Sequence, residues 1–324
     1  MNTDLFAAQL SQVFAATSGT SIAPIWRRFV AYLADSILLG FIGAGIGKVL
    51  SEQLSHLGAW GVLVGFFVSS LYFASLDCSI GNGQTLGKRF LKVRLVGVNG
   101  KPVSFEKAFA RYSVFAAPGI AYGLKLPETT TPWFVSALVF VVIYWIGGST
   151  FYLVMLERIN RQGLHDLAVG SYVVYADHEG PLERELVPPL HWVVLVSLLT
   201  TLTVSAAMFK DWSDSQPTAL EFHRDTRLVE SLEGVQRAHI TDGLTHGPDG
   251  SVNKILYISV TRKTKPANEE AFTYDLTKTL LDADRNLLGY DLVYVRLFYG
   301  YDIGVARHWE HSEFGRSPSA WRAH

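Results

Sequence analysis

Charge is scarce in this chain. Lys, Arg, Asp and Glu make up 18% of its 324 residues, whereas soluble globular chains carry about 25%. Together with 49% hydrophobic residues and a positive mean hydropathy, this deficit argues against an ordinary soluble domain and indicates a protein embedded in a lipid bilayer. The formal net charge of −1 lacks the basic excess of nucleic-acid binders, so no nucleic-acid partner is predicted.

Disulfides, a leader pattern and metal-ligand spacings are missing as well. Cys78 is the single cysteine, which excludes an intrachain disulfide. Residues 1–24 carry no Lys or Arg and lack the charged start and cleavage pattern of a signal peptide. Neither His165-Asp166 nor the pair His308 and His311 amounts to a ligand set. We therefore predict no metal, no cofactor, no catalytic residue and no enzymatic activity.

Long apolar runs are what the sequence does contain. A membrane helix needs about 20 mostly apolar residues. Four stretches meet that length: 29–50, 58–76, 133–156 and 190–209. A fifth, 108–126, carries Arg111 near its start and Lys125 at its end. It either lies on the membrane surface, which leaves four spans, or crosses with its two cations at opposite interfaces.

The distribution of basic residues and the pairing of two short strands both favour five spans. With the N-terminus in the cytoplasm, five spans gather the basic residues on the cytoplasmic side, as the positive-inside rule requires. These residues are Arg27, Arg28, six Lys and Arg from Lys88 to Lys107, Arg111, Arg158, Arg161 and Arg184. The stretches 92–98 and 169–176 also read as short strands, rich in β-branched residues. They can pair only on one membrane face, so an even number of spans must separate them.

The predicted fold is an α-helical multipass membrane protein of about five spans, with a small cytoplasmic β element and a C-terminal soluble α+β domain. It is placed in the inner (plasma) membrane, with the C-terminal domain outside the cytoplasm. The predicted parts are an N-terminal segment (1–24), a transmembrane domain (25–188), an additional transmembrane helix (189–210), the soluble domain (211–314) and a disordered tail (315–324). Within the soluble domain we predict strands at 252–263, 290–300 and 301–311, a helix at 268–288 and a loop at 241–251.

An aspartate lies deep in the first predicted span. Asp35 is six residues beyond Phe29, about 9 Å further along the axis, where a carboxylate costs about 2.5–3.5 kcal/mol unless it faces protein or water. Arg28 shares its helix face, but the rise of about 10.5 Å between them rules out a direct pair. Arg111 is the predicted partner of Asp35. The two interpretations are an ion pair that fixes helix register and a transport role.

Two glycine-rich stretches suggest nucleotide binding and fail the test. "GNGQTLGKRF" (81–90) lacks the opening glycine and the closing hydroxyl of a P-loop. "GFIGAGIG" (40–47) lies within an apolar helix, so Gly43 and Gly47 predict a close-packing seam for another helix. For Lys88 and Arg89 two interpretations remain, an interfacial basic motif that anchors to anionic headgroups and the mouth of a polar pathway.

Three segments in order resemble the RDD family of bacterial and archaeal membrane proteins, named for one arginine and two aspartates. "WRRFVAYLAD" resembles its opening signature, with Arg28 and Asp35 as the arginine and first aspartate. Residues 83–111 resemble its most recognisable segment, and "RQGLHDLAVGSYVV" (161–174) its closing element, with Gly163-Leu164 where Thr or Ser is usual. The second aspartate is Asp166 or Asp77. The resemblance covers about residues 24–176.

For that family, the resemblance implies transport, and sodium–proton antiport has been described for some members. The first hypothesis is therefore transport or ion and proton coupling centred on Asp35, in contact with the lipid bilayer and as a homo-oligomer, since five spans are few for a transporter. The alternative is a membrane anchor that presents residues 211–314 to a protein partner without transport. The substrate and the partner are not specified by the sequence.

Overall fold

The structure, a computed structural model, describes residues 22–126, 131–157, 160–183, 186–246 and 251–323. The predicted N-terminal segment up to residue 21 and the cations Arg158 and Arg184 lie outside these ranges. Contacts divide the chain into two units, each of which draws on several stretches of sequence. Unit 1 comprises residues 1–39, 67–118 and 141–199, and unit 2 comprises residues 40–66, 119–140 and 200–324.

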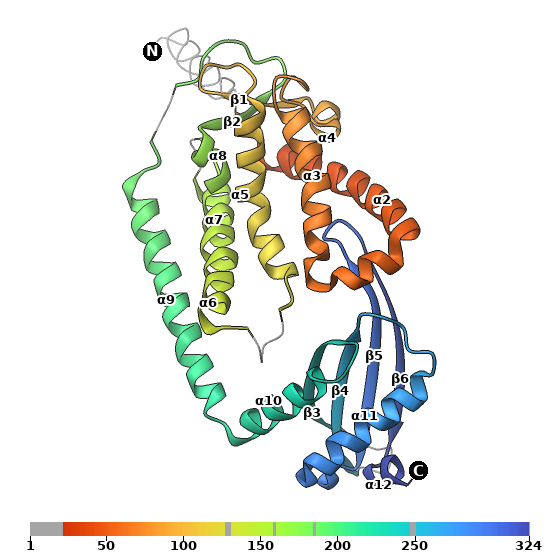
Figure 1. Cartoon of the computed structure of the whole chain (residues 1–324). Helices are drawn as coiled ribbons and strands as arrows, with labels where there is room; N and C mark the ends of the chain where they lie inside the picture. Colours follow the sequence, from red (N-terminus) through yellow and green to blue (C-terminus); the bar gives the residue numbers. More distant parts are fainter. Residues whose placement is uncertain (1–21, 127–130, 158–159, 184–185, 247–250, 324) are drawn as a thin grey trace. The chain divides into compact units, whose positions relative to one another are not determined.

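Helices make up most of the first 214 residues. They are α2 (Ile25–Leu57), the 3-10 turn η1 (Gly58–Gly61), α3 (Val62–Asp77), α4 (Leu86–Phe90), α5 (Phe105–Gly123), α6 (Trp133–Val141), the π-helical η2 (Val142–Gly147), α7 (Gly148–Leu156), α8 (Leu164–Val169) and α9 (Pro189–Asp214) (Figure 1). Leu50 has non-helical backbone angles, φ −116° and ψ 23°, and marks a kink in α2. The α helices of unit 2 that follow are α10 (Pro217–Glu230), α11 (Glu269–Ala283) and α12 (Pro318–Arg322).

Among the described residues, three helical segments are long and apolar enough to cross a membrane: Ile25–Asp77, Trp133–Leu156 and Pro189–Ser213. The first contains two of the predicted spans, 29–50 and 58–76, joined by η1. α5, the predicted fifth span, is a helix of 19 residues that this criterion leaves out. These three segments agree with the predicted helical membrane fold, and the number of five spans stays a prediction.

The small β element of unit 1 is a two-stranded antiparallel sheet. β1 (Val93–Gly97) pairs with β2 (Ser171–Tyr175), with Leu95 opposite Val173, which confirms the predicted pairing of these two distant segments. Val93, Leu95 and Val173 are buried together with Ala23 and Cys78. Figure 1 shows this sheet at one end of α5, α7 and α8.

The C-terminal part of unit 2 is a four-stranded sheet of order β3-β4-β5-β6, in which only the β4–β5 pair is parallel. The strands are β3 (Val235–His246), β4 (Val252–Arg262), β5 (Leu292–Asp302) and β6 (Arg307–Arg316). α11 lies against one face (Figure 1), where alternate strand residues such as Ile258 and Val295 pack against Leu276 and Leu280. The opposite face carries the other residues of each strand.

Three details of the predicted C-terminal domain are wrong. The predicted loop 241–251 begins inside β3, which extends to His246 and pairs with β4. The last strand, β6, starts at Arg307 rather than at residue 301. The predicted disordered tail contains α12, in which Trp321 is fully buried and donates its indole N–H to the carbonyl of Val293 at 3.1 Å.

The glycine seam of α2 is occupied by the turn between β5 and β6 instead of the predicted helix. A Cβ on Gly47 would lie 1.8 Å from the Tyr301 hydroxyl, and one on Gly43 would lie 2.8 Å from Cγ2 of Val305. From the other arm of the α2–α3 hairpin, a Cβ on Gly65 would lie 1.8 Å from the carbonyl oxygen of Ile303. Within unit 2, therefore, the missing side chains admit a turn of the sheet domain between the two helical arms.

Candidate functional site

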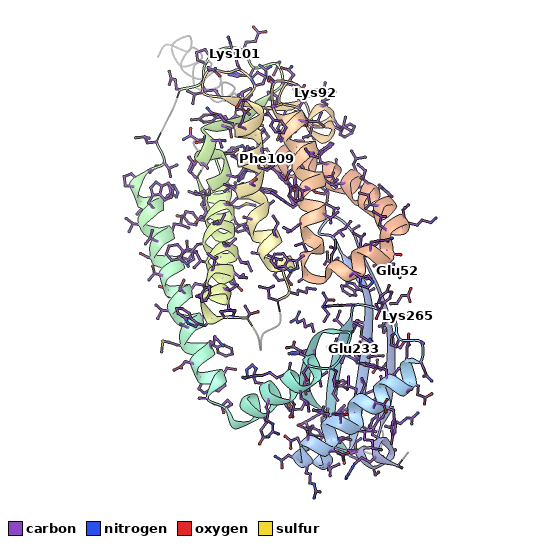
Figure 2. The ribbon with its side chains drawn as sticks, in the orientation of Figure 1. Glu52, Lys92, Lys101, Phe109, Glu233 and Lys265 are labelled. Atoms are coloured by element: carbon purple, nitrogen blue, oxygen red, sulfur yellow. The ribbon has the colours of Figure 1, made fainter. Side chains whose placement is uncertain are left out.

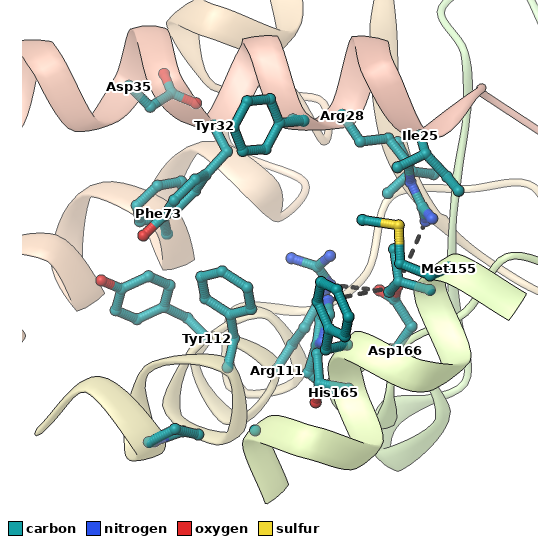
Figure 3. A pocket seen from close by; sticks show the side chains of 18 of the residues that line it. Ile25, Arg28, Tyr32, Asp35, Phe73, Arg111, Tyr112, Met155, His165 and Asp166 are labelled. Atoms are coloured by element: carbon teal, nitrogen blue, oxygen red, sulfur yellow. Dashed lines mark hydrogen bonds and ion pairs between the residues drawn. The ribbon is translucent and has the colours of Figure 1, made fainter. Parts of the chain in front are cut away.

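The charged residues predicted from the sequence gather in unit 1 around one cavity (Figure 3). They come from four helices: Arg28 and Asp35 from α2, Lys88 from α4, Arg111 from α5, and His165 and Asp166 from α8. Asp77, at the end of α3, joins them through Lys88 and Arg111. The fold thus brings residues that are up to 138 positions apart in the sequence into contact.

Asp166 is the centre of the cluster. It is 1% exposed and accepts a hydrogen bond from Nε of Arg111 at 2.7 Å. Arg28 lies 3.4 Å from its other oxygen and donates a second hydrogen bond to the carbonyl of Arg161. Burial opposes ionisation of Asp166, but the surrounding charges, led by Arg111, outweigh it and hold the pKa of this carboxyl below its ordinary value. Asp166 is therefore charged at physiological pH.

A second ion pair, between Lys88 and Asp77, adjoins the pair of Arg111 and Asp166. The ammonium group of Lys88 contacts both oxygens of Asp77, one of them at 2.5 Å. Arg111 reaches the same carboxylate, with Nη1 3.6 Å from Oδ2, and so bridges Asp77 and Asp166. Burial lowers the pKa of Lys88, although Asp77 acts in the opposite direction. Both candidates for the second family aspartate are thus in one network.

Asp35 is not paired with Arg111, and that prediction is wrong. Its two oxygens accept hydrogen bonds from three neutral donors: the Tyr72 hydroxyl at 2.6 Å, the Thr85 hydroxyl at 2.6 Å and the Gly87 N–H at 2.8 Å. Arg111 extends toward α8 instead. The prediction that Arg28 and Asp35 form no pair with each other agrees with their observed partners.

The three donors explain the stretch 81–90. Gly83 adopts φ +73°, and Thr85 caps α4 by accepting the N–H of Lys88. Gly87 packs against α2 so closely that a Cβ would lie 2.1 Å from the carbonyl oxygen of Ala31. The turn therefore binds α4 to Asp35, and its glycines serve packing and conformation rather than a phosphate.

Neighbouring cations in α4 have different environments. Lys88 is 8% exposed and ion-paired, which contradicts its interpretation as an anchor to lipid headgroups. Arg89 is exposed, and that interpretation stays a prediction for it. A step of about 100° per residue in a helix accounts for the difference.

His165 brings an unpaired nitrogen to the cavity. It is 6% exposed, and Phe115 packs edge-on against its ring at a centroid distance of 5.1 Å. Its Nε2 lies 3.4 Å from Asp166, while Nδ1 is buried without a hydrogen-bond partner among the described residues. Burial lowers the pKa of His165 to about 3, so the ring is neutral at physiological pH.

The cavity has a volume of about 380 Å³. Arg111, His165 and Asp166 line one part of it, and the aromatic side chains of Tyr32, Phe73 and Tyr112 line another, near Asp35 (Figure 3). Phe29 and Phe151, which are 63% and 66% exposed, also border it and mark an open side. A polar solute or the polar end of an amphipathic one would thus meet cations, carboxylates and a neutral imidazole together.

Some residues of this region were missed by sequence reasoning. Tyr72 and Thr85 complete the Asp35 site, and no spacing in the sequence links them to it. Glu157, which directly follows α7 and is 1% exposed, accepts the backbone N–H of Asn160 with both of its carboxylate oxygens. A buried acid directly after an apolar run was the available signal. No group of three or more His, Cys, Asp or Glu residues within the described ranges is arranged to hold a metal ion.

Residues 22–170 match the model of the RDD family, and the network residues, from Arg28 to Asp166, lie within that range. This region is an RDD-family domain. The chain is also similar to the uncharacterized protein YxaI of Bacillus subtilis (strain 168), with 24% identity over 47% of this chain and 97% of YxaI. No solved structure matches the chain. The sheet domain after α9 lies outside the RDD match.

Proposed function

We propose that the RDD region exchanges a cation for a proton, with the Lys88–Asp77 pair as the exchanging element in place of Asp35. The observation that carries the proposal is a buried amine in contact with both oxygens of a buried carboxylate, in a network beside a cavity. Burial disfavours the charged form of Lys88 and lowers its pKa. Lys88 is the base of this network that can lose a proton, because Arg28 and Arg111 stay protonated.

Charge balance supports the exchange. The ion-pair network and the adjacent Asp35 together contain three acids and three bases: Asp35, Asp77, Asp166, Arg28, Lys88 and Arg111. A cation that binds Asp77 in place of the ammonium group makes the proton on Lys88 unfavourable. When Lys88 releases that proton, the entering charge is compensated, so one cation replaces one proton without a net charge in a low-dielectric region.

Asp35 has a structural role in this proposal. Three donors already occupy its oxygens and hold α4 against α2. Asp35→Asn is therefore expected to lower thermal stability, with any loss of flux following from that. Loss of flux at unchanged stability would return the exchanging role to Asp35.

The test uses the full chain in proteoliposomes with a trapped pH-sensitive dye, into which Na⁺ or K⁺ is pulsed. Lys88→Arg keeps a positive charge beside Asp77 but cannot release a proton, so we expect at least a tenfold loss of cation-dependent proton movement. The matched control is Lys92→Arg, because Lys92 is exposed, and it should behave as the original chain. Wild-type flux in Lys88→Arg, or no cation-dependent flux in the unaltered chain, would refute the proposal.

The proposal includes five spans, a cytoplasmic N-terminus and a C-terminal domain outside the cytoplasm, in the plasma (inner) membrane. α5 packs beside the helical segment formed by α6, η2 and α7, because a Cβ on Gly147 of η2 would lie 3.2 Å from Pro118 of α5. At its other end α5 contacts α8, since Arg111 is paired with Asp166. If α5 crosses with α6–α7, two crossings separate β1 from β2, as their pairing requires. Lys92 and Lys101 lie at the β1–β2 end of unit 1, which supports a cytoplasmic position for it (Figure 2).

A second candidate is a membrane anchor that presents the sheet domain to a protein partner. The face of the sheet opposite α11 supports it, since Tyr257 and Tyr294 stack there at 5.8 Å and Arg296 lies 5.0 Å over Tyr257. If the double change Tyr257→Ala and Tyr294→Ala removed the cellular phenotype while Lys88→Arg preserved it, this candidate would replace the first.

A further inference from the structure

A second cavity, of about 360 Å³, lies in unit 2 and is separate from the charged network. The strand register shows what forms its floor. Arg237 is opposite Thr261, Thr261 is opposite Phe298, and the pairs Gly300–Trp309 and Asp302–Arg307 continue the same face toward the end of β5. This is the face that α11 leaves uncovered, because the core residues Val260 and Leu297 alternate with it.

The rim of this cavity comes from helix ends. Gly58 and Ala59 belong to η1, the turn between the apolar helices α2 and α3, and Gly123 and Lys125 are at the end of α5. A Cβ on Gly58 would lie 1.6 Å from Nε2 of Gln236, so the turn rests directly on the sheet. The cavity is therefore at the level where apolar helices reverse direction.

Positive charge dominates the lining. Among the described residues that line it are three cations, Lys125, Arg237 and Arg307, and one carboxylate, that of Asp302, although the whole chain has a net charge of −1. Asp302 accepts the Gly304 N–H at 2.8 Å and so has part of its capacity occupied. Within the ranges that the structure describes, neither Lys125 nor Arg307 has a carboxylate at ion-pair distance.

We propose that this cavity binds a phosphate group. Two guanidinium groups and an ammonium group suit its charge and its several acceptor oxygens, while Trp309 and Phe298 offer an apolar wall to the rest of the ligand. The phosphate belongs either to the headgroup of an anionic phospholipid, which the position beside helix turns and a tryptophan favours, or to a soluble phosphate compound.

The test compares the detergent-purified full chain with the double variant Lys125→Gln and Arg307→Gln. Native mass spectrometry counts retained phosphatidylglycerol against phosphatidylcholine, and thermal melts in inorganic phosphate measure binding of the free anion. We expect at least a tenfold weaker binding in the double variant, since each charge-assisted hydrogen bond contributes about a factor of ten. The matched control is Arg285→Gln, an exposed cation of the same unit outside the cavity.

The two arms identify the source of the phosphate. Selective retention of phosphatidylglycerol, lost in the double variant, supports the lipid headgroup, and stabilisation by inorganic phosphate alone supports a soluble ligand. Equal melting temperatures of the three chains without ligand would show that the substitutions leave the fold intact. If neither probe binds, or if the double variant binds as the unaltered chain does, the proposal is overturned.

Discussion

Gly87→Ala is expected to destabilise the RDD region strongly, although alanine is the better helix former. The new Cβ would lie 2.1 Å from the carbonyl oxygen of Ala31 and 3.0 Å from Cγ of Asp35, and the first of these is backbone that cannot rotate away. Overpacking costs about 1–3 kcal/mol. Moving α4 away also weakens the 2.8 Å bond from the Gly87 N–H to Asp35, and a hydrogen bond to a charged group is worth about 1.5–3 kcal/mol.

The two terms together give about 2.5–6 kcal/mol, or a fall in Tm of about 5–24 °C for a unit of this size. Thermal melts in detergent, followed by circular dichroism, measure it. Gly119→Ala is the matched control, because nothing lies within 4 Å of its Cβ position in α5, and it should be neutral or stabilising. If Gly87→Ala melted like Gly119→Ala, the close approach of α4 to α2 and the structural role of Asp35 would both be refuted.

Two further predictions concern topology and pH. Single cysteines at the exposed positions Ser104 and Ser215, in a Cys78→Ser background, should differ on intact spheroplasts: a membrane-impermeant thiol reagent labels 215 and not 104, whereas protection of both until lysis would mean four spans. Because the pKa of His165 is about 3 in the folded chain and about 6.5 when unfolded, the unfolded state takes up the proton first as pH falls. The free energy of unfolding should drop by about 2 kcal/mol from pH 7 to 5, and His165→Gln should flatten that slope in denaturant titrations; an equal slope in both chains would contradict it.

Local pattern was enough to predict several elements. The β-branched runs at 92–98 and 169–176 became β1 and β2 because each alone leaves its backbone unpaired, so the pairing was the one available to them. An acid within an apolar run had to be buried, and Asp35 is. β3 was missed because Asp242 and Gly243 are turn residues, which the long ladder with β4 overrides.

The partners of the buried charges could not be predicted in the same way. Asp35 and Arg111 have opposite charges and both lie toward the predicted cytoplasmic ends of their helices. Which partner each one takes depends on where α4 approaches α2 and where α8 approaches α5. The tail did contain a usable signal: Ser317-Pro318 is a typical helix start, and Ser317 accepts the N–H of Ala320 as an N-cap does. Trp321, three residues after Pro318, is then the apolar side chain by which this helix packs against the core of the sheet domain.

The ion pairs of the RDD region form one continuous chain, and this has a consequence for the proposed exchange. Arg28 contacts Asp166, Asp166 contacts Arg111, Arg111 contacts Asp77, and Asp77 contacts Lys88. The chain thereby connects α2, α8, α5, α3 and α4. In the proposed exchange the entering cation replaces the ammonium group of Lys88 at Asp77 and shares that carboxylate with Arg111, which changes the hold of Arg111 on Asp166. A change of charge at α4 is thus transmitted to the contact between α8 and α2 through side chains that already touch, which gives the exchange a physical route to a change in helix packing.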